Sequence, residues 1–327
     1  MIAIVLIALA AGCASALMFA SIVSGALISL LLFYLAPLPL MVAALGWGPL
    51  SATLGGIAAS IGLGTMFGLP LCIAFALAVA LPAWWLGHLV LLGRPTSSNV
   101  ASAEERTLVT PDLEWYPLGR ILLWTSGFAA LITMAELLSL GLDAATIKDT
   151  LRQGLLSIVK IIRAGDAPAT GQTEPVIDVM ATIAPVAAAI VTTSTLTLNL
   201  WLAAKITAIS GRLHRPWPEL KAAALPSAVL IALCLALAFC FTGGLVAIAA
   251  QIIAATLMLA YAITGFAVLH TLTMALKSRG IWLGCTYGIV LVFVWPVVVM
   301  AALGLFDAIF GIRRRYLKRR PPPLPAS

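Results

Sequence analysis

The first 93 residues of the chain contain no lysine, arginine, aspartate or glutamate. Soluble domains carry about 25% charged residues, so this stretch cannot form a surface that faces water. One membrane crossing takes about 20 apolar residues, and the stretch therefore predicts three or four spans. The rest of the chain is similar, since 62% of its 327 residues are hydrophobic and 9% are charged. We therefore expect an integral membrane protein that crosses the bilayer several times.

The apolar runs predict an all-α fold, a polytopic bundle of transmembrane helices. Strands of a membrane barrel alternate apolar and polar residues, whereas the runs here are continuous, and helices satisfy their own backbone in lipid. The first run, at 2–35, is long enough to cross with tilt or to bend near Ser24 and Gly25, and Pro37 is expected to follow its end. About eight spans are predicted, at roughly 2–35, 49–67, 69–92, 119–142, 176–209, 222–241, 245–276 and 281–310.

Residues 144–163 have a different pattern, which predicts an amphipathic helix lying on the membrane surface. Apolar residues recur at three- and four-residue steps, and basic residues lie on another face of the helix. The apolar positions are Ile147, Leu151, Leu155, Ile158 and Ile162, and the basic positions are Lys148, Arg152, Lys160 and Arg163.

The net charge of +7 comes largely from six basic residues in 313–320. A basic cluster just after an apolar span is typical of a cytoplasmic segment, and it attracts anionic lipid headgroups. We therefore expect a lipid bilayer as partner and no nucleic acid. The predicted organisation is a membrane domain over 1–312 and a basic, proline-rich tail over 313–327.

The expected spans do not determine which end of the chain faces the cytoplasm. With eight spans, ten basic residues fall on the side of the C-terminus and nine on the other side, so the two sides do not differ. The terminal cluster alone places the C-terminus in the cytoplasm. The expected location is the inner, or cytoplasmic, membrane as a multi-pass protein.

Small residues recur at every fourth position in the first two expected spans. Small residues let helices approach closely in lipid, so these two stripes predict either packing within the chain or docking of a membrane protein partner. Their members are Ala8, Gly12, Ala16, Ala20 and Ser24, then Gly48, Ala52, Gly56, Ser60 and Gly64.

Few polar residues lie at membrane depth, and six of them are candidates to line a ligand cavity between the fourth, fifth and seventh spans. Hydroxyl groups can instead bond to the helix backbone, and Glu136 is close enough to Asp143 to lie near the interface. The candidates are Glu136, Thr195, Asn199, Gln251, Tyr261 and His270.

No sequence motif of an enzyme is present in the chain. The metalloprotease, nucleophile-elbow, phosphate-loop and dinucleotide-binding patterns are all missing. The five cysteines lie in apolar runs without metal-ligand spacing. We therefore expect no catalytic residue, no metal and no cofactor.

Six short stretches carry a resemblance to a known family. They are Phe33–Pro39, Leu81–Gly87, Leu113–Pro117, Arg215–Pro218, Gly265–His270 and Gly304–Asp307. Together they resemble the bacterial YybS-like family of predicted membrane proteins, a domain of unknown function, in the form typical of alphaproteobacteria. The resemblance covers nearly the whole chain and implies no catalytic activity.

That family is distantly similar to the S components of energy-coupling factor transporters, which bind a vitamin or metal and meet a coupling subunit through small-residue stripes. The resemblance therefore implies a transport-related binding subunit with an unknown substrate. The chain departs from S components in having about eight spans where they have six, and in lacking a vitamin-binding motif. The alternative is an interaction or scaffold protein in envelope or cell-cycle processes, which the basic helix at 144–163 and the basic tail favour.

Overall fold

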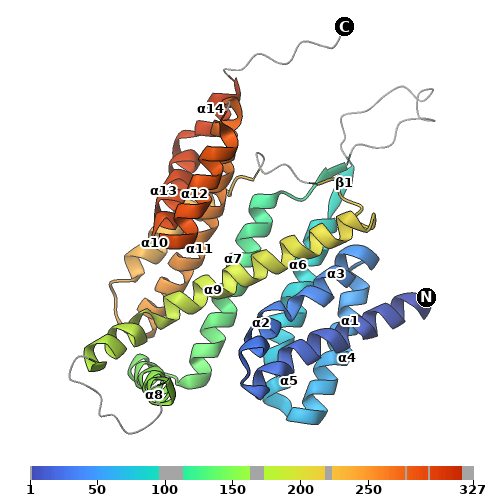
Figure 1. The fold of residues 1–327 in the computed structure, drawn as a ribbon, viewed down its shortest axis with the longest axis vertical. Coiled ribbons are helices and arrows are strands. Elements are labelled where there is room, and N and C mark those ends of the chain that lie inside the picture. The colour runs from blue at the N-terminus through green and yellow to red at the C-terminus, as the bar shows by residue number, and fades with distance from the viewer. Residues whose placement is uncertain are drawn as a thin grey trace. The chain divides into compact units, whose positions relative to one another are not determined.

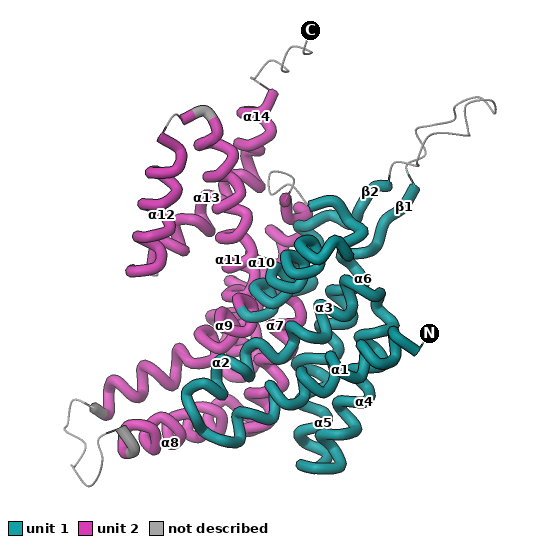
Figure 2. The backbone as a smooth tube through the Cα atoms, turned by 45° about the vertical axis from the view of Figure 1, so that its right-hand side comes forward, with its two compact units in different colours: residues 1–125, 195–218 teal, residues 126–194, 219–327 magenta. Residues whose placement is uncertain are grey.

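The computed structural model of the chain describes residues 2–95, 113–162, 173–217, 223–276, 278–293 and 295–318. It confirms the all-α membrane fold, because seven helices of the described residues are long and apolar enough to cross a bilayer, or up to eight if one bent pair forms a single span. Contacts divide the chain into two compact units, coloured separately in Figure 2. Unit 1 comprises residues 1–125 and 195–218, and unit 2 comprises residues 126–194 and 219–327.

Unit 1 contains helices that follow one another almost without loops. Prolines lie in the first turn of several of them, where the N–H that proline lacks has no partner within the helix. In chain order (Figure 1) the elements are α1 (Ile2–Ala20), the 3-10 helix η1 (Ser21–Ser24), α2 (Leu27–Leu35), α3 (Pro37–Trp47), α4 (Pro49–Phe67), α5 (Leu69–Phe75), the π-helical turn η2 (Ala76–Ala80) and α6 (Leu81–Leu91).

The chain turns at Ser24 and Gly25, which confirms one of the two alternatives expected for the first run. The expected number of crossings was too low, because residues 2–47 contain two segments that are each long and apolar enough to cross. The first ends after η1, where Gly25 turns the chain with a φ of 68°, a conformation that glycine adopts without strain. The second crossing runs from Leu27 to Trp47. Pro37 does not end it, since Ala36 keeps helical angles and Pro37 occupies the first turn of α3.

Helices α1 and α4 contact each other at Ala8, Gly12 and Gly55, whose side chains are no larger than a methyl group. A Cβ on Gly12 would lie 2.3 Å from the Gly55 carbonyl oxygen, and one on Gly55 would lie 2.3 Å from the Ala8 carbonyl oxygen. On the next face of α4, a Cβ on Gly56 would lie 3.0 Å from the Ala80 Cβ. The small residues at Ala8, Gly12 and Gly56 therefore pack against helices of this same chain.

The other members of the two stripes differ in exposure along each helix. Ser24 is exposed and Gly48 precedes α4 with a φ of 94°. The buried members are Ala8, Gly12, Ala52, Gly56 and Ser60, and the half-buried members are Ala16, Ala20, Gly48 and Gly64.

Two short strands connect the helices of unit 1 where the sequence predicted only a polar loop. Strand β1 (Gly93–Pro95) pairs antiparallel with β2 (Leu113–Trp115), and Arg94 lies opposite Glu114. The Arg94 and Glu114 side chains form an exposed ion pair, with Nη2 2.7 Å from Oε2.

Helices α7 (Leu118–Leu140) and α9 (Thr173–Ile209) belong to both units, because the division falls inside each of them. The remaining elements of unit 2 are α8 (Ala144–Ile162), α10 (Ala228–Phe239), α11 (Gly244–Leu272), the 3-10 helix η4 (Thr273–Ala275), α12 (Arg279–Phe293), α13 (Pro296–Phe310) and α14 (Ile312–Lys318). Figure 1 labels the α-helices among them.

The structure also corrects the last expected span. The apolar run at 281–310 is two helices, α12 and α13, because Pro296 starts a new helix and lacks the N–H that would continue the old one. Helix α13 is followed by α14 after a bend of 65°. The sixth expected span, at 222–241, contains only the 12-residue helix α10.

The amphipathic helix expected at 144–163 is present as α8. Its Ile147 is buried against Leu137, Ala189 and Ile252, so the first turns of α8 pack on the core of unit 2. Arg152 of α8 forms ion pairs with two acidic residues at the start of α9, Glu174 and Asp178. The basic residue Arg163 lies outside the described residues.

Candidate functional site

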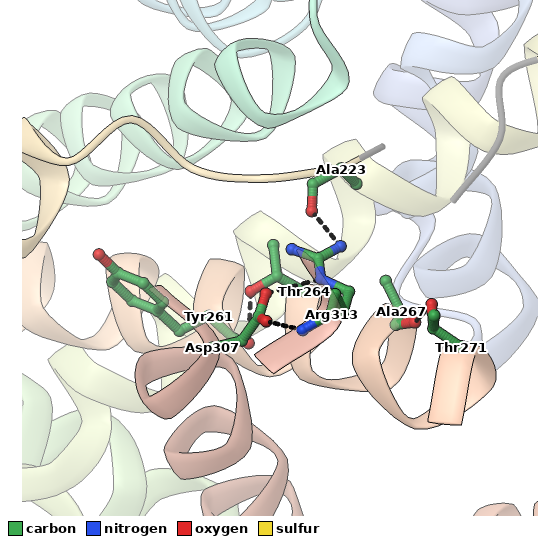
Figure 3. A network of polar contacts seen from close by, with 7 residues as sticks. All are labelled: Ala223, Tyr261, Thr264, Ala267, Thr271, Asp307 and Arg313. Atoms are coloured by element: carbon green, nitrogen blue, oxygen red, sulfur yellow. Dashed lines mark hydrogen bonds and ion pairs between the residues drawn. The ribbon is translucent and has the colours of Figure 1, made fainter. Parts of the chain in front are cut away.

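A buried ion pair joins the ends of α13 and α14. Asp307 Oδ2 accepts a hydrogen bond from Nε of Arg313 at 2.6 Å, and Oδ1 accepts one from the backbone N–H of Arg313 at 2.7 Å. Each side chain is 8% exposed. The Nη1 of Arg313 donates to the Ala223 carbonyl oxygen at 2.8 Å, as Figure 3 shows. One arginine therefore links α13, α14 and the segment that precedes α10.

The local geometry explains why this pair forms. Gly311 takes a left-handed conformation with a φ of 61°, which ends α13 and starts α14 in a new direction. The first N–H groups of a helix have no acceptor within it, and the Asp307 carboxylate supplies one for Arg313. A buried charge pair is tolerated only when its hydrogen bonds are satisfied, and here the carboxylate and the guanidinium both have partners.

An open pocket of about 660 Å³ lies beside the ion pair, within unit 2. Helix α11 contributes Tyr261 and Thr264 to its wall. Figure 3 shows Thr264 close to the ion pair and the ring of Tyr261 directed away from it. The rest of the lining is both basic and apolar, and includes Arg314, Arg315, Lys318, Ile309, Phe310 and Leu317.

Two glycines let α11 and α13 cross at the base of this pocket. A Cβ on Gly265 would lie 1.9 Å from the Met300 carbonyl oxygen, and a Cβ on Gly304 would lie 2.0 Å from the Tyr261 carbonyl oxygen. Only glycine fits at such distances. The crossing therefore fixes α13, and with it Asp307, against α11.

Unit 1 also has a basic end, where cations lie over aromatic rings. The Arg212 guanidinium lies 4.6 Å from the centroid of the Trp47 ring, and Lys205 Nζ lies 5.0 Å from that of Trp217. Aromatic and basic residues are typical of the interface between membrane and water. These pairs therefore mark where the last turns of α3 and α9 leave the apolar layer.

Arg215 is buried at the same end of unit 1. Its Nη1 donates to the Val90 carbonyl oxygen at 3.2 Å, its Nη2 donates to that of Tyr116 at 3.0 Å, and its guanidinium lies over the Trp115 ring. Burial lowers the pKa of Arg215, yet a guanidinium keeps its proton in proteins. Arg215 therefore holds the end of α6 and the start of α7 together.

The predicted cavity residues in unit 1 have a structural role. The buried Asn199 donates from Nδ2 to the Tyr34 carbonyl oxygen on α2 and to that of Thr195, both at 2.8 Å. Thr195 is half-buried. Asn199 thus ties α9 to α2, although its Oδ1 has no hydrogen-bond partner among the described residues.

The other candidates belong to unit 2 and are spread along its helices. His270 Nε2 shares a hydrogen bond with the Tyr287 hydroxyl at 2.8 Å. Gln251 is half-buried, and Glu136 is exposed one turn before the end of α7. Tyr261 is the one candidate on the lining of the pocket described above. The six candidates lie in two different units, and the pocket does not gather them.

Asp307, Arg313 and Arg215 were not among the predicted site residues. Arg313 was assigned to the tail, but the structure places it inside α14 and buries its side chain. A usable signal was the acidic Asp307 within the apolar run 296–310, because an isolated carboxylate there needs a partner. Residues 319–327 of the predicted tail lie outside the described residues.

Four of the six stretches that carried the family resemblance meet in two pairs. Arg215 contacts the stretch Leu113–Pro117, and Gly265–His270 lies in the helix that crosses Gly304–Asp307. Their residues thus pack elements together. Comparison of the chain with models of protein families, with curated proteins and with solved structures found no match. Within the described residues, no group of three or more His, Cys, Asp or Glu could hold a metal ion.

Proposed function

We propose that the protein is an interaction protein of the cytoplasmic membrane, which presents a basic face to the cytoplasm and binds anionic lipid there. The observation that supports this most strongly is the distribution of basic residues over the two sides of the membrane. The distribution differs from the one expected from eight spans, because the structure has an additional span at 27–47 and divides the last expected span into two helices.

The contacts in unit 1 place one end of several helices on the same side. Trp47 at the end of α3 meets Arg212 after α9, and Val90 at the end of α6 meets Arg215. Helix α7 starts at this end, next to Tyr116. Since α7 and α9 each cross the bilayer, the segment between them lies on the opposite side.

A short link connects the basic end of unit 1 to the first residues of unit 2 that follow it in the chain. Only residues 218–222 separate Trp217 from Ala223, and such a link spans at most about 22 Å, less than the roughly 30 Å of the hydrocarbon layer. In unit 2, Ala223 contacts Arg313, and the Leu272 carbonyl oxygen accepts a hydrogen bond from Tyr316. Within unit 2, the start of α10, the end of α11 and α14 lie together, and we infer from the length of the link alone that they face the same compartment as Trp217.

Of the 13 basic residues that the structure describes, ten are then assigned to one side and three to the other. The three are Lys148, Arg152 and Lys160. A bias of this size favours a cytoplasmic location for the basic side. The division differs from the even one expected from eight spans, because the run at 2–47 contains two spans and because α12 and α13 are here assigned one crossing each.

The geometry favours this role over a transport-related, S-component-like cavity. Asn199 uses its amide N–H groups within unit 1, and His270 is paired with Tyr287. The resemblance to the YybS-like family stays a prediction and adds no activity of its own.

The proposal is tested by the lipids that accompany the protein through purification. The full chain is extracted in a mild neutral detergent, and its lipids are compared with those of the source membrane by mass spectrometry. We expect enrichment of anionic over zwitterionic lipids, because the attraction is about 1 kcal/mol per basic residue near the surface. Lipids in the same proportions as the source membrane would contradict the proposal.

A further inference from the structure

The pocket at the basic end of unit 2 has both cationic and apolar side chains in its lining. Arg314, Arg315 and Lys318 line it and are exposed. Ile309 and Phe310 also line it and are 55% and 50% exposed. A lining of this kind suits a molecule that has an anionic group attached to an apolar chain.

The pocket has an excess of positive charge. Its acidic residue, Asp307, is engaged by the side chain and the backbone N–H of Arg313. None of the four ion pairs between described residues includes Arg314, Arg315 or Lys318. Guanidinium groups bind phosphate through two parallel hydrogen bonds, and an ammonium group binds it as a point charge, so Arg314, Arg315 and Lys318 suit a phosphate group.

The buried ion pair fixes the start of the helix that carries these cations before any ligand binds. Asp307 fixes the start of α14 through the backbone N–H of Arg313, and Ala223 fixes the Arg313 side chain from a second segment. Binding then orders fewer groups, which favours affinity. The arrangement differs in this respect from a flexible basic tail.

We propose that this pocket binds the phosphate group of an anionic amphiphile, such as a phospholipid of the cytoplasmic leaflet. The inference rests on the proposed basic face and names the ligand class and the site for it. Basic pockets at the ends of membrane helices bind acidic headgroups in this way. A free phosphate ion would use the same cations, but it would leave Ile309 and Phe310 without a partner.

The test uses the purified full chain in neutral detergent and follows its thermal unfolding midpoint, since a ligand of the folded state raises that midpoint. Short-chain phosphatidylglycerol, short-chain phosphatidylcholine and inorganic phosphate are titrated separately. We expect a saturable rise with phosphatidylglycerol, a smaller rise with phosphate at higher concentration and little change with phosphatidylcholine.

Two variants assign the response to the pocket. The triple variant removes the three exposed cations of the pocket and is Arg314→Gln/Arg315→Gln/Lys318→Gln. The control variant removes two exposed cations of α8, away from the pocket, and is Lys148→Gln/Lys160→Gln. The binding constant of the triple variant for phosphatidylglycerol is expected to be at least about tenfold weaker. The binding constant of the control variant is expected to stay unchanged. The charge-conserving Arg314→Lys/Arg315→Lys variant should retain most of the binding, which shows that the fold tolerates substitution there.

Three results would overturn the inference. They are equal binding of phosphatidylglycerol by the wild type and the triple variant, equal responses to phosphatidylcholine and phosphatidylglycerol, and a response to inorganic phosphate without one to phosphatidylglycerol. With the first result, enrichment of anionic lipids during purification would still leave the basic-face function standing. Without that enrichment, the proposed function itself would fail.

Discussion

The Asp307 carboxylate accepts hydrogen bonds from both the backbone and the side chain of Arg313, six residues further along the chain. It is the one ion pair between described residues in which both side chains are buried. Removing either partner would leave the other as an unpaired buried charge, which is why the pair matters for stability.

Asp307→Asn is expected to lower the free energy of unfolding by about 3–5 kcal/mol, the usual cost of breaking a buried charge pair. Glu114→Gln is the matched control, because it breaks the exposed pair with Arg94, and exposed pairs contribute about 0–1 kcal/mol. Unfolding in mixed micelles of rising dodecyl sulfate content measures both variants. Equal losses for the two would show that Asp307 has no special role.

Gly12→Ala is expected to destabilise the packing of α1 on α4. The new Cβ would lie 2.3 Å from the Gly55 carbonyl oxygen, and overpacking of this kind costs about 1–3 kcal/mol. Gly62→Ala, in α4, has open space around the new methyl group and is expected to be neutral or stabilising. The same unfolding measurement compares them, and a tolerated Gly12→Ala would contradict the close approach of the two helices.

Asn199→Ala removes the hydrogen bond between α9 and the Tyr34 carbonyl oxygen on α2. Hydrogen bonds between membrane helices contribute about 0.6 kcal/mol on average and up to about 1.7, so a loss in that range is expected. Ser194→Ala serves as the control, because the Ser194 hydroxyl donates to the Ile190 carbonyl oxygen in its own helix. Had Asn199 served a ligand cavity instead, its loss would lower ligand binding and leave unfolding unchanged.

The start of α8 is expected to depend on pH through Asp143. The Thr146 hydroxyl and backbone N–H donate to its carboxylate, which lowers the pKa of Asp143 below 3.8. Because the pKa of Asp143 is lower in the folded state than its ordinary value of 3.8, the ionised carboxylate stabilises the folded state above pH 3.8. This stabilisation is lost as the pH falls through the folded-state pKa. A spin label on Ala145→Cys should therefore gain mobility below pH 3.8, and Asp143→Asn should remove that dependence. A pH-independent wild type would contradict the cap.

The sequence predicted the membrane class, the surface helix α8 and most of the long spans, because those depend on local hydrophobicity. It missed the crossing at Leu27–Trp47, since prolines at Pro37 and Pro39 look like a helix end when the backbone angles of Ala36 are unknown. It could not find the Asp307–Arg313 pair or the contact of Arg215 with Val90. Both contacts depend on which helices pack against each other, and the local pattern of residues along the chain does not determine this packing.

The proposed function requires the basic residues of both units to face one compartment. It is tested by replacing the five native cysteines and introducing single cysteines at Ser24, Arg94, Thr242, Ser278 or Arg315, all exposed. Spheroplasts are then treated with a membrane-impermeant maleimide. We predict labelling at positions 24 and 242 in intact spheroplasts, and at 94, 278 and 315 only after the membrane is opened. Labelling of positions 94 and 315 from opposite sides would contradict the account.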